Sequence, residues 1–135
     1  MPATDEMAIN AVRQGFLEGY NKGDAAGLAA CGSDDIVQLP PNEATVRGKE
    51  PIEARYRAQF DRFACDLSTM TEELQISDQW AFAWGTYKIT LNPRDGAATI
   101  RDNGKYIAIF RWECDGSRKF ARDTFNSDNP TPTAA

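Results

Sequence analysis

The chain has 135 residues, of which 41% are hydrophobic and 26% charged, a composition typical of one globular domain rather than a disordered or fibrous chain. Its 20 acidic and 15 basic residues give a net charge of −5, and the bases are scattered among acids. A nucleic-acid-binding protein more often carries a basic stripe, so we predict no nucleic-acid partner. No stretch approaches the ~20 apolar residues of a membrane span, and the N-terminus lacks a signal pattern. We therefore predict a cytoplasmic protein without a membrane partner.

Residue types that commonly carry chemistry are scarce. The chain has no histidine, which removes the commonest general base near neutral pH and the commonest metal ligand. Cys31, Cys65 and Cys114 lie far apart and are odd in number, so they form neither a disulfide framework nor a zinc motif. No nucleotide or flavin motif is present. We predict that the protein binds no cofactor and no metal.

The first half of the chain has helical periodicity. A first helix is predicted from a cap at Thr4 or Asp5 to a left-handed glycine at Gly23. Asp24 can cap a second short helix that ends near Cys31, and residues 49–63 form a third. The apolar stripe of the first helix comprises Ile9, Val12, Phe16, Leu17 and Tyr20.

Between and after these helices the pattern is that of strands. Residues 32–35 are predicted to turn, and residues 36–39 to form a short strand that stops at Pro40 and Pro41. A meander follows, with helices on one face of a curved sheet, in one domain over residues 1–135. Its core covers about residues 6–129, and both ends are expected to fray. The later strands are predicted at residues 66–76, 80–91, 105–113 and 119–126.

Several segments in this order resemble the SnoaL-like, or polyketide-cyclase-like, branch of the nuclear transport factor 2-like superfamily. The resemblance implies an α+β fold: a cone-shaped, strongly bent antiparallel sheet that wraps three N-terminal helices, as in cystatin-like folds. It also implies an apolar pocket at the wide end of the cone. The segments that carry it are 20–24 (YNKGD), 33–42 (SDDIVQLPPN), 46–50 (VRGKE), 80–87 (WAFAWGTY), 115–119 (DGSRK) and 123–128 (DTFNSD).

The catalytic residues of enzymes in this superfamily cannot be carried over directly to this chain. Ketosteroid isomerase relatives need a tyrosine, an aspartate base and a protonated aspartate. The matching positions here hold Phe16, Pro40 and Ala108, which argues against that mechanism. Cyclase relatives often use a His–Asp pair, which this chain lacks. The Asp–Arg–Asp cluster of epoxide hydrolase relatives has no clear counterpart.

Strand alternation nevertheless predicts a pocket. Ala121, Asp123 and Phe125 share one face of the last strand, and the small and aromatic neighbours put Asp123 inside. Asp123 is the candidate general acid or base; the alternative is a structural aspartate bound to a tyrosine hydroxyl or a backbone amide. The predicted ligand-binding pocket comprises Phe16, Tyr20, Gln38, Tyr56, Tyr87, Tyr106, Ala108, Asp123 and Phe125.

The same alternation turns large aromatic residues outward. Trp80, Phe82 and Trp84, with Ile107 and Ile109 of the next strand, are predicted to form an apolar outer face that binds a second copy in a homodimer.

Three functions stay open. The leading one is binding of a small, largely apolar organic ligand. The alternatives are an isomerase, cyclase or hydrolase that uses Asp123, and a non-catalytic association module. An open pocket favours the first two, and a pocket plugged by aromatic side chains favours the third.

Overall fold

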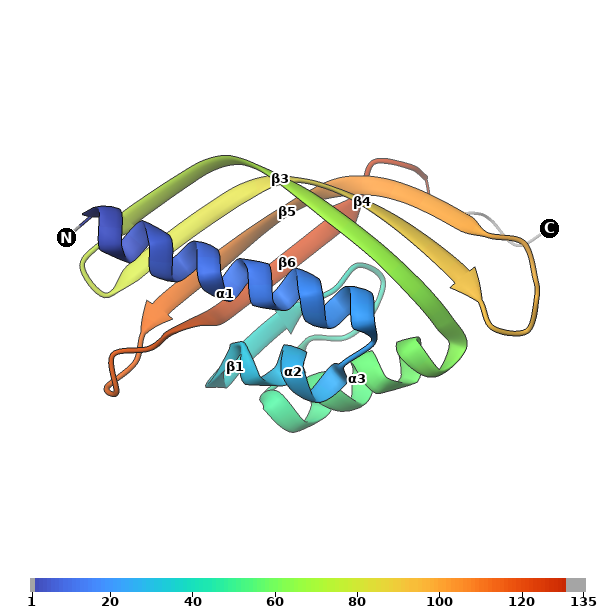
Figure 1. The fold of residues 1–135 in the computed structure, drawn as a ribbon, viewed down its shortest axis with the longest axis horizontal. Coiled ribbons are helices and arrows are strands. Elements are labelled where there is room, and N and C mark those ends of the chain that lie inside the picture. The colour runs from blue at the N-terminus through green and yellow to red at the C-terminus, as the bar shows by residue number, and fades with distance from the viewer. Residues whose placement is uncertain (1, 131–135) are drawn as a thin grey trace.

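A computed structural model of the chain describes residues 2–130, with side chains from residue 5 onward. This part of the chain forms three helices and six strands (Figure 1). The three helices and two short strands come first, and the last four strands form a long meander. The elements are α1 (Pro2–Lys22), α2 (Ala25–Ala30), β1 (Gly32–Leu39), β2 (Val46–Arg47), α3 (Lys49–Arg62), β3 (Phe63–Ser77), β4 (Trp80–Pro93), β5 (Ile100–Trp112) and β6 (Arg118–Ser127).

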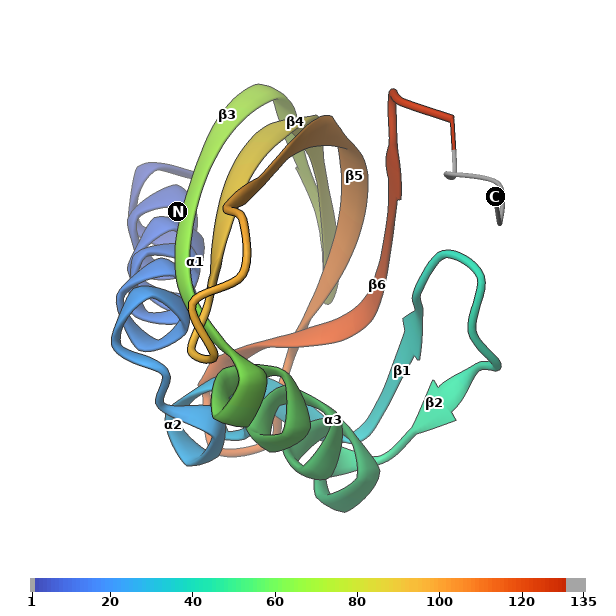
Figure 2. The same cartoon turned by 90° about the vertical axis from the view of Figure 1, so that its right-hand side faces the viewer.

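The six strands form one sheet in the order β2-β1-β6-β5-β4-β3. Only β1 and β6 pair in parallel; the other neighbours are antiparallel. The sheet curls without closing, and the helices lie along its open side (Figure 2). One source of curvature is a bulge in β3 between Thr71 and Glu73, opposite Gly85. A Cβ at Gly85 would lie 2.0 Å from the carbonyl oxygen of Met70, so the close approach of the two strands requires glycine there.

The helices begin and end where the local sequence dictates. α1 crosses the concave face of the sheet and ends at Gly23, whose φ of 72° is left-handed (Figure 1). The Asp24 carboxylate then accepts a 3.0 Å hydrogen bond from the Gly27 amide and caps α2. These features confirm the predicted α+β cone.

Two groups of buried side chains form the core. The first joins the three helices: Tyr20 of α1 contacts the rings of Tyr56 and Phe60 of α3, and α2 adds Ala25 and Leu28. The second lies between the start of α1 and the middle strands and is centred on Ile9 and Phe110, both fully buried. Phe120 packs against both groups. Helices therefore pack against the concave face of the sheet through both groups of buried side chains.

Some predicted boundaries were wrong. Residues 32–35 do not turn; they open β1, because Ser33 is buried and the exposed Asp35 pairs with Arg111 at 2.5 Å. β5 begins at Ile100 rather than at residue 105, since residues 100–104 pair with residues 87–91 of β4 despite their polar sequence. α1 begins at Pro2, and residues 131–135 of the expected loose tail lie outside the described residues. No helix in the described part of the chain is long and apolar enough to cross a membrane.

Candidate functional site

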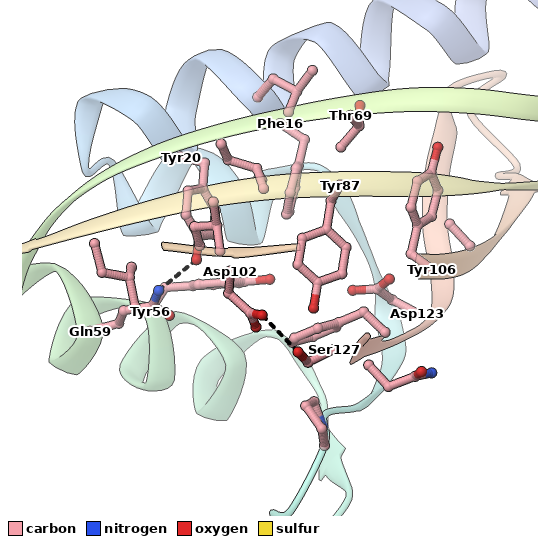
Figure 3. Close-up of a pocket in the computed structure, with 18 of the residues that line it drawn as sticks. Phe16, Tyr20, Tyr56, Gln59, Thr69, Tyr87, Asp102, Tyr106, Asp123 and Ser127 are labelled. Carbon is pink, nitrogen blue, oxygen red and sulfur yellow. Dashed lines mark hydrogen bonds between the residues drawn. The ribbon is translucent and has the colours of Figure 1, made fainter. Parts of the chain in front are cut away.

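A cavity of about 810 Å³ lies between α1, α3 and the concave face of the sheet (Figure 3). Its walls are mostly aromatic and aliphatic side chains with a few polar groups, the usual make-up of a small-molecule site. Pro41 and Asn42 of the β1–β2 loop also line it, as do Asn129 and Pro130 after β6. The cavity is open rather than plugged by its own side chains.

The structure brings almost all of the predicted pocket residues to this cavity. Gln38 is the exception: it is only 2% exposed and lies one layer behind the wall, in contact with Tyr56 and Asp123. Its alternation in β1 does turn it inward as predicted, but neighbouring side chains cover it. The eight predicted residues that line the cavity are Phe16, Tyr20, Tyr56, Tyr87, Tyr106, Ala108, Asp123 and Phe125.

Gln38 connects the polar groups on the cavity floor. Its Nε2 donates to the Tyr56 hydroxyl at 2.7 Å and to Asp123 Oδ2 at 3.2 Å. Its Oε1 accepts from Arg55 Nη1 at 3.4 Å, and this contact fixes which way the amide points. Both amide hydrogens are thereby used. Among the hydrogen bonds of the described residues, none joins Asp123 Oδ1 to the protein, so this oxygen is available to a ligand.

Burial raises the pKa of Asp123 from 3.8 to about 6, and the Gln38 hydrogen bond and the Arg55 charge offset only part of this effect. The side chain is half-buried because protein surrounds it except where it meets the cavity. Burial, aided by the nearby Asp123 charge, raises the pKa of Tyr56 above its ordinary value. Near neutral pH the floor therefore combines a carboxyl that can gain or lose a proton with a neutral phenol.

A second tyrosine faces the same space. The Tyr87 ring lies against β5 at Gly104, where a Cβ would be 2.1 Å from the carbonyl oxygen of Asn126 and 2.6 Å from the Tyr87 hydroxyl. Glycine at this position therefore makes the room that the Tyr87 side chain occupies. Burial, with smaller effects of Asp102 and Asp128, raises the pKa of Tyr87 to about 12. The Tyr87 ring makes an edge-to-face contact with Phe125, with the ring centroids 6.1 Å apart.

Sequence reasoning missed Arg55. It bonds both carboxylate oxygens of Glu43, from Nε at 3.1 Å and from Nη2 at 2.7 Å. Its guanidinium carbon lies 5.9 Å from the Tyr56 ring centroid and 6.0 Å from that of Phe125. Arg55 could have been predicted as a site residue from its position on α3 next to the inward-facing Tyr56.

Asp102 was missed because the predicted strand began too late. Its Oδ1 accepts hydrogen bonds from Ser127 Oγ and Asn129 Nδ2, each at 2.7 Å. Burial opposes ionisation, but these two bonds and a backbone bond from Asn103 outweigh it, so the pKa of Asp102 is lowered. Continuing the inward alternation of Tyr106 back through Gly104 would have found it. Asn129, the last residue of the predicted core, also belongs to this wall.

The positions that matter for a ketosteroid isomerase mechanism carry no such chemistry. Phe16 and Ala108 line the cavity as apolar surface, and Pro40 is buried. Within residues 2–130, no three cysteine, aspartate or glutamate side chains are grouped closely enough to hold a metal ion. The lack of a cofactor stays a prediction.

The outer face of the sheet carries the predicted aromatic residues. Trp80, Trp84 and Ile107 are 43%, 41% and 40% exposed, and Trp84 pairs directly with Ile107 across β4 and β5. Phe82 and Ile109, also directly paired, are partly buried on the same face. The side chains of this outer face do not reach the cavity.

Comparisons with known proteins agree with this architecture. A sequence model of the SnoaL-like domain matches residues 13–122. The chain belongs to the SnoaL-like family. No curated protein matches it.

Solved structures extend the likeness. A conserved protein from Planctomyces limnophilus DSM 3776 is 30% identical, with a TM-score of 0.86 over 93% of this chain and 98% of that one. A ketosteroid isomerase-like protein from Erwinia carotovora atroseptica SCRI1043 is 22% identical, with a TM-score of 0.83 over 92% and 96%. A nuclear transport factor 2-like superfamily protein from Salmonella enterica is 15% identical, with a TM-score of 0.82 over 98% and 96%. The last two support the fold alone. The predicted family and fold are confirmed.

Proposed function

We propose that this SnoaL-like protein binds a small, largely apolar organic molecule in the cavity, with Asp123 as the polar group that the ligand meets. The observation that carries the proposal is the open cavity of about 810 Å³ with a half-buried carboxyl on its wall. Pockets of roughly 300–1,000 Å³ with apolar walls and few polar groups are typical of small-molecule sites. A cavity plugged by its own aromatic side chains would favour an association module, and this cavity is open instead.

The test is a protein-observed NMR screen of mono- and bicyclic fragments at millimolar concentration. We expect fragments to shift signals of cavity residues such as Phe16, Tyr87 and Phe125. A matched variant, Ala108→Phe, fills the cavity from its wall and should abolish these shifts while the outer face stays unchanged. Ala58→Phe, on the exposed side of α3, is the control of equal size. Equal binding to the Ala108→Phe variant, or no cavity shifts in the wild type, would overturn the proposal.

A second function, proton transfer on the bound molecule, is favoured by the shared contact of Asp123 and Tyr56 with Gln38. A carboxylate with a pKa of about 6 can take a proton from one ligand atom and return it to another, while the neutral phenol donates a hydrogen bond to the ligand. One structural relative carries the words ketosteroid isomerase-like in its name. The residues differ here, so Asp123 would act from its own position on β6.

Proton transfer is tested with any fragment that binds and carries an exchangeable C–H bond. Incubated in D₂O, it should gain deuterium faster with the wild type than with Asp123→Asn, along a pH profile with an inflection near 6. Equal rates in both proteins would rule out Asp123 as the acid or base.

We also propose that the outer face of the sheet joins two copies in a homodimer. Exposed Trp80, Trp84 and Ile107 on one face support it, since apolar groups of this size usually mark an interface. Light scattering at micromolar concentration should give twice the 14.9 kDa chain mass, and a monomer would contradict it. The cytoplasmic location stays a prediction.

A further inference from the structure

A cluster of hydrogen-bond donors on the cavity wall indicates the chemistry of the ligand. Arg13 of α1, Thr71 of β3 and Tyr106 of β5 meet where α1 crosses the sheet. Arg13 Nη2 donates to Thr71 Oγ1 and, at 3.4 Å, to the Tyr106 hydroxyl. The two hydroxyl oxygens lie 3.1 Å apart and share one hydrogen bond. Arg13 and Tyr106 line the cavity, and Figure 3 shows the Tyr106 side chain on the same wall as Asp123.

Donors outnumber acceptors in this cluster. Arg13 carries five N–H groups, and its partners among the described residues are Asn10 Oδ1, Thr71 Oγ1 and the Tyr106 hydroxyl. Only one of the two hydroxyl hydrogens lies between Thr71 and Tyr106, which leaves the other for a further acceptor. All three partners of Arg13 are neutral, and no ion pair within 4.0 Å involves Arg13 in the described part of the chain.

The other two cationic side chains on the wall differ from Arg13. Glu43 already binds Arg55 through both carboxylate oxygens, so that charge is matched inside the protein. Arg101 is exposed. Of the three cations on the cavity wall, Arg13 is therefore the one that is half-buried and has no carboxylate partner among the described residues. A ligand oxygen beside it would complete the cluster.

We propose that the ligand is a monocarboxylate, with its carboxylate held by Arg13 and the Tyr106 hydroxyl and its apolar body along the aromatic walls. This inference rests on the proposed function, because it names the class of molecule in the same cavity. One guanidinium matches one negative charge, and the acidic side chains of Asp102 and Asp123 on the wall disfavour a dianion such as a phosphate monoester.

Strand register sets where the rest of the ligand lies. Tyr106 is two residues from Ala108 on the same face of β5, and Ala108 pairs directly with Asp123 of β6. Diagonal neighbours of this kind start ~7–8 Å apart. A carboxylate bound at Arg13 therefore leaves the carbons a few bonds away within reach of Asp123, which is where the proton transfer proposed above would act.

The experiment compares the affinities of an acid and its isosteric amide, separately for the wild type and for each variant. The probes are 2-naphthoate with 2-naphthamide, and cyclohexanecarboxylate with cyclohexanecarboxamide, with affinities from NMR titration at pH 7.5. In the wild type we expect each acid to bind at least tenfold more tightly than its amide. In Arg13→Gln the acid should lose this advantage while amide binding stays, and Arg13→Lys should restore part of it. Arg57→Gln, an exposed change on α3, is the control and should behave as the wild type.

The outcomes separate the two proposals. Equal affinity of acid and amide for the wild type, or an unchanged preference in Arg13→Gln, overturns the carboxylate assignment and leaves the cavity as a binding site for neutral ligands. Binding of neither acid nor amide to the cavity overturns the proposed function and this inference with it. Amide binding reports in each variant that the cavity is folded, and raising the salt from 50 to 500 mM should weaken only the acids.

Discussion

Gln38 Nε2 donates a hydrogen bond to Asp123 Oδ2 at 3.2 Å, which joins residues 85 positions apart in the chain. The parallel pairing of β1 with β6 places the two residues side by side, and the same amide nitrogen also binds Tyr56. One buried glutamine thus orients the two groups that the proposed proton transfer uses.

Replacing this glutamine should disturb both groups at once. Gln38→Leu leaves the Tyr56 hydroxyl and the Asp123 carboxyl without their shared donor, and a lost partner of a buried polar group costs about 1–3 kcal/mol of unfolding free energy. It should also raise the pKa of Asp123 further, because the Gln38 hydrogen bond lowers it. Urea unfolding and carboxyl NMR titration measure the two effects. An unchanged pKa would show that the bond does not stabilise the carboxylate.

Asp123→Asn should stabilise the protein at alkaline pH. The folded pKa of about 6 exceeds the ordinary 3.8, so the folded state favours the protonated form. The contribution of Asp123 to stability is then complete below about pH 4 and is lost as the pH rises through 6, by up to about 3 kcal/mol. Asparagine keeps a neutral acceptor for Gln38 and avoids this loss.

The difference in unfolding free energy between wild type and Asp123→Asn at pH 4 and pH 8 isolates this residue from other acids. Asp5 and Asp35, whose pKa values are lowered by hydrogen bonds from Arg118 and Arg111 respectively, affect both proteins equally. We expect the variant to be the more stable of the two only at pH 8, with weaker ligand binding. A variant less stable at both pH values and with unchanged binding would indicate a structural aspartate.

Gly104→Ala should destabilise the protein and disturb the cavity wall. Its Cβ would meet the carbonyl oxygen of Asn126 at 2.1 Å, a backbone atom that cannot move without breaking the β5–β6 pairing. We expect a loss of several kcal/mol in unfolding free energy. Gly15→Ala, with nothing within 4 Å on α1, is the matched control and should gain about 1 kcal/mol from helix propensity. Similar behaviour of both variants in thermal unfolding would contradict the packing argument.

Ile107→Glu should produce a monomer. The side chain lies directly opposite Trp84 on the outer face, so in a homodimer the new charge would be buried in the interface without a partner. Light scattering should report half the wild-type mass, and fragment binding in the cavity should persist. Ala58→Glu on α3 is the charge-matched control. A wild-type mass for Ile107→Glu would place the interface elsewhere.

Much of the fold was predictable because the signals are local. Alternation in residues 119–126 turned Asp123 inward, and Asp24 and Gly23 marked the junction of α1 and α2 correctly. Residues 32–35 were missed as the start of β1, where Gly32 pairs with Phe120, a residue far away in sequence. Residues 100–104 were missed because their polar sequence gives no apolar alternation, although they pair with residues 87–91 across the β4–β5 hairpin. At residues 32–35 the local polarity predicts a turn, and the folded sheet overrides this preference.

The candidate site was predictable only in part for the same reason. The inward position of Gln38 followed from alternation, but its cover by Tyr56 and Asp123 depends on long-range packing. Arg13 sits on the predicted first helix, yet its role depends on Thr71 and Tyr106, which only the folded sheet brings to it. The charge balance of a cavity cannot be deduced from the sequence as long as it is unknown which side chains contact one another.

The most direct measurement is the ¹³C-carboxyl NMR titration of Asp123, with and without a saturating cavity ligand. We expect an apparent pKa near 6 in the free protein and a clear change when the ligand binds, because a ligand that meets the carboxyl must favour one protonation state. A pKa near the ordinary 3.8, or a pKa that a bound ligand leaves unmoved, would contradict the claim that Asp123 is the polar group of this site.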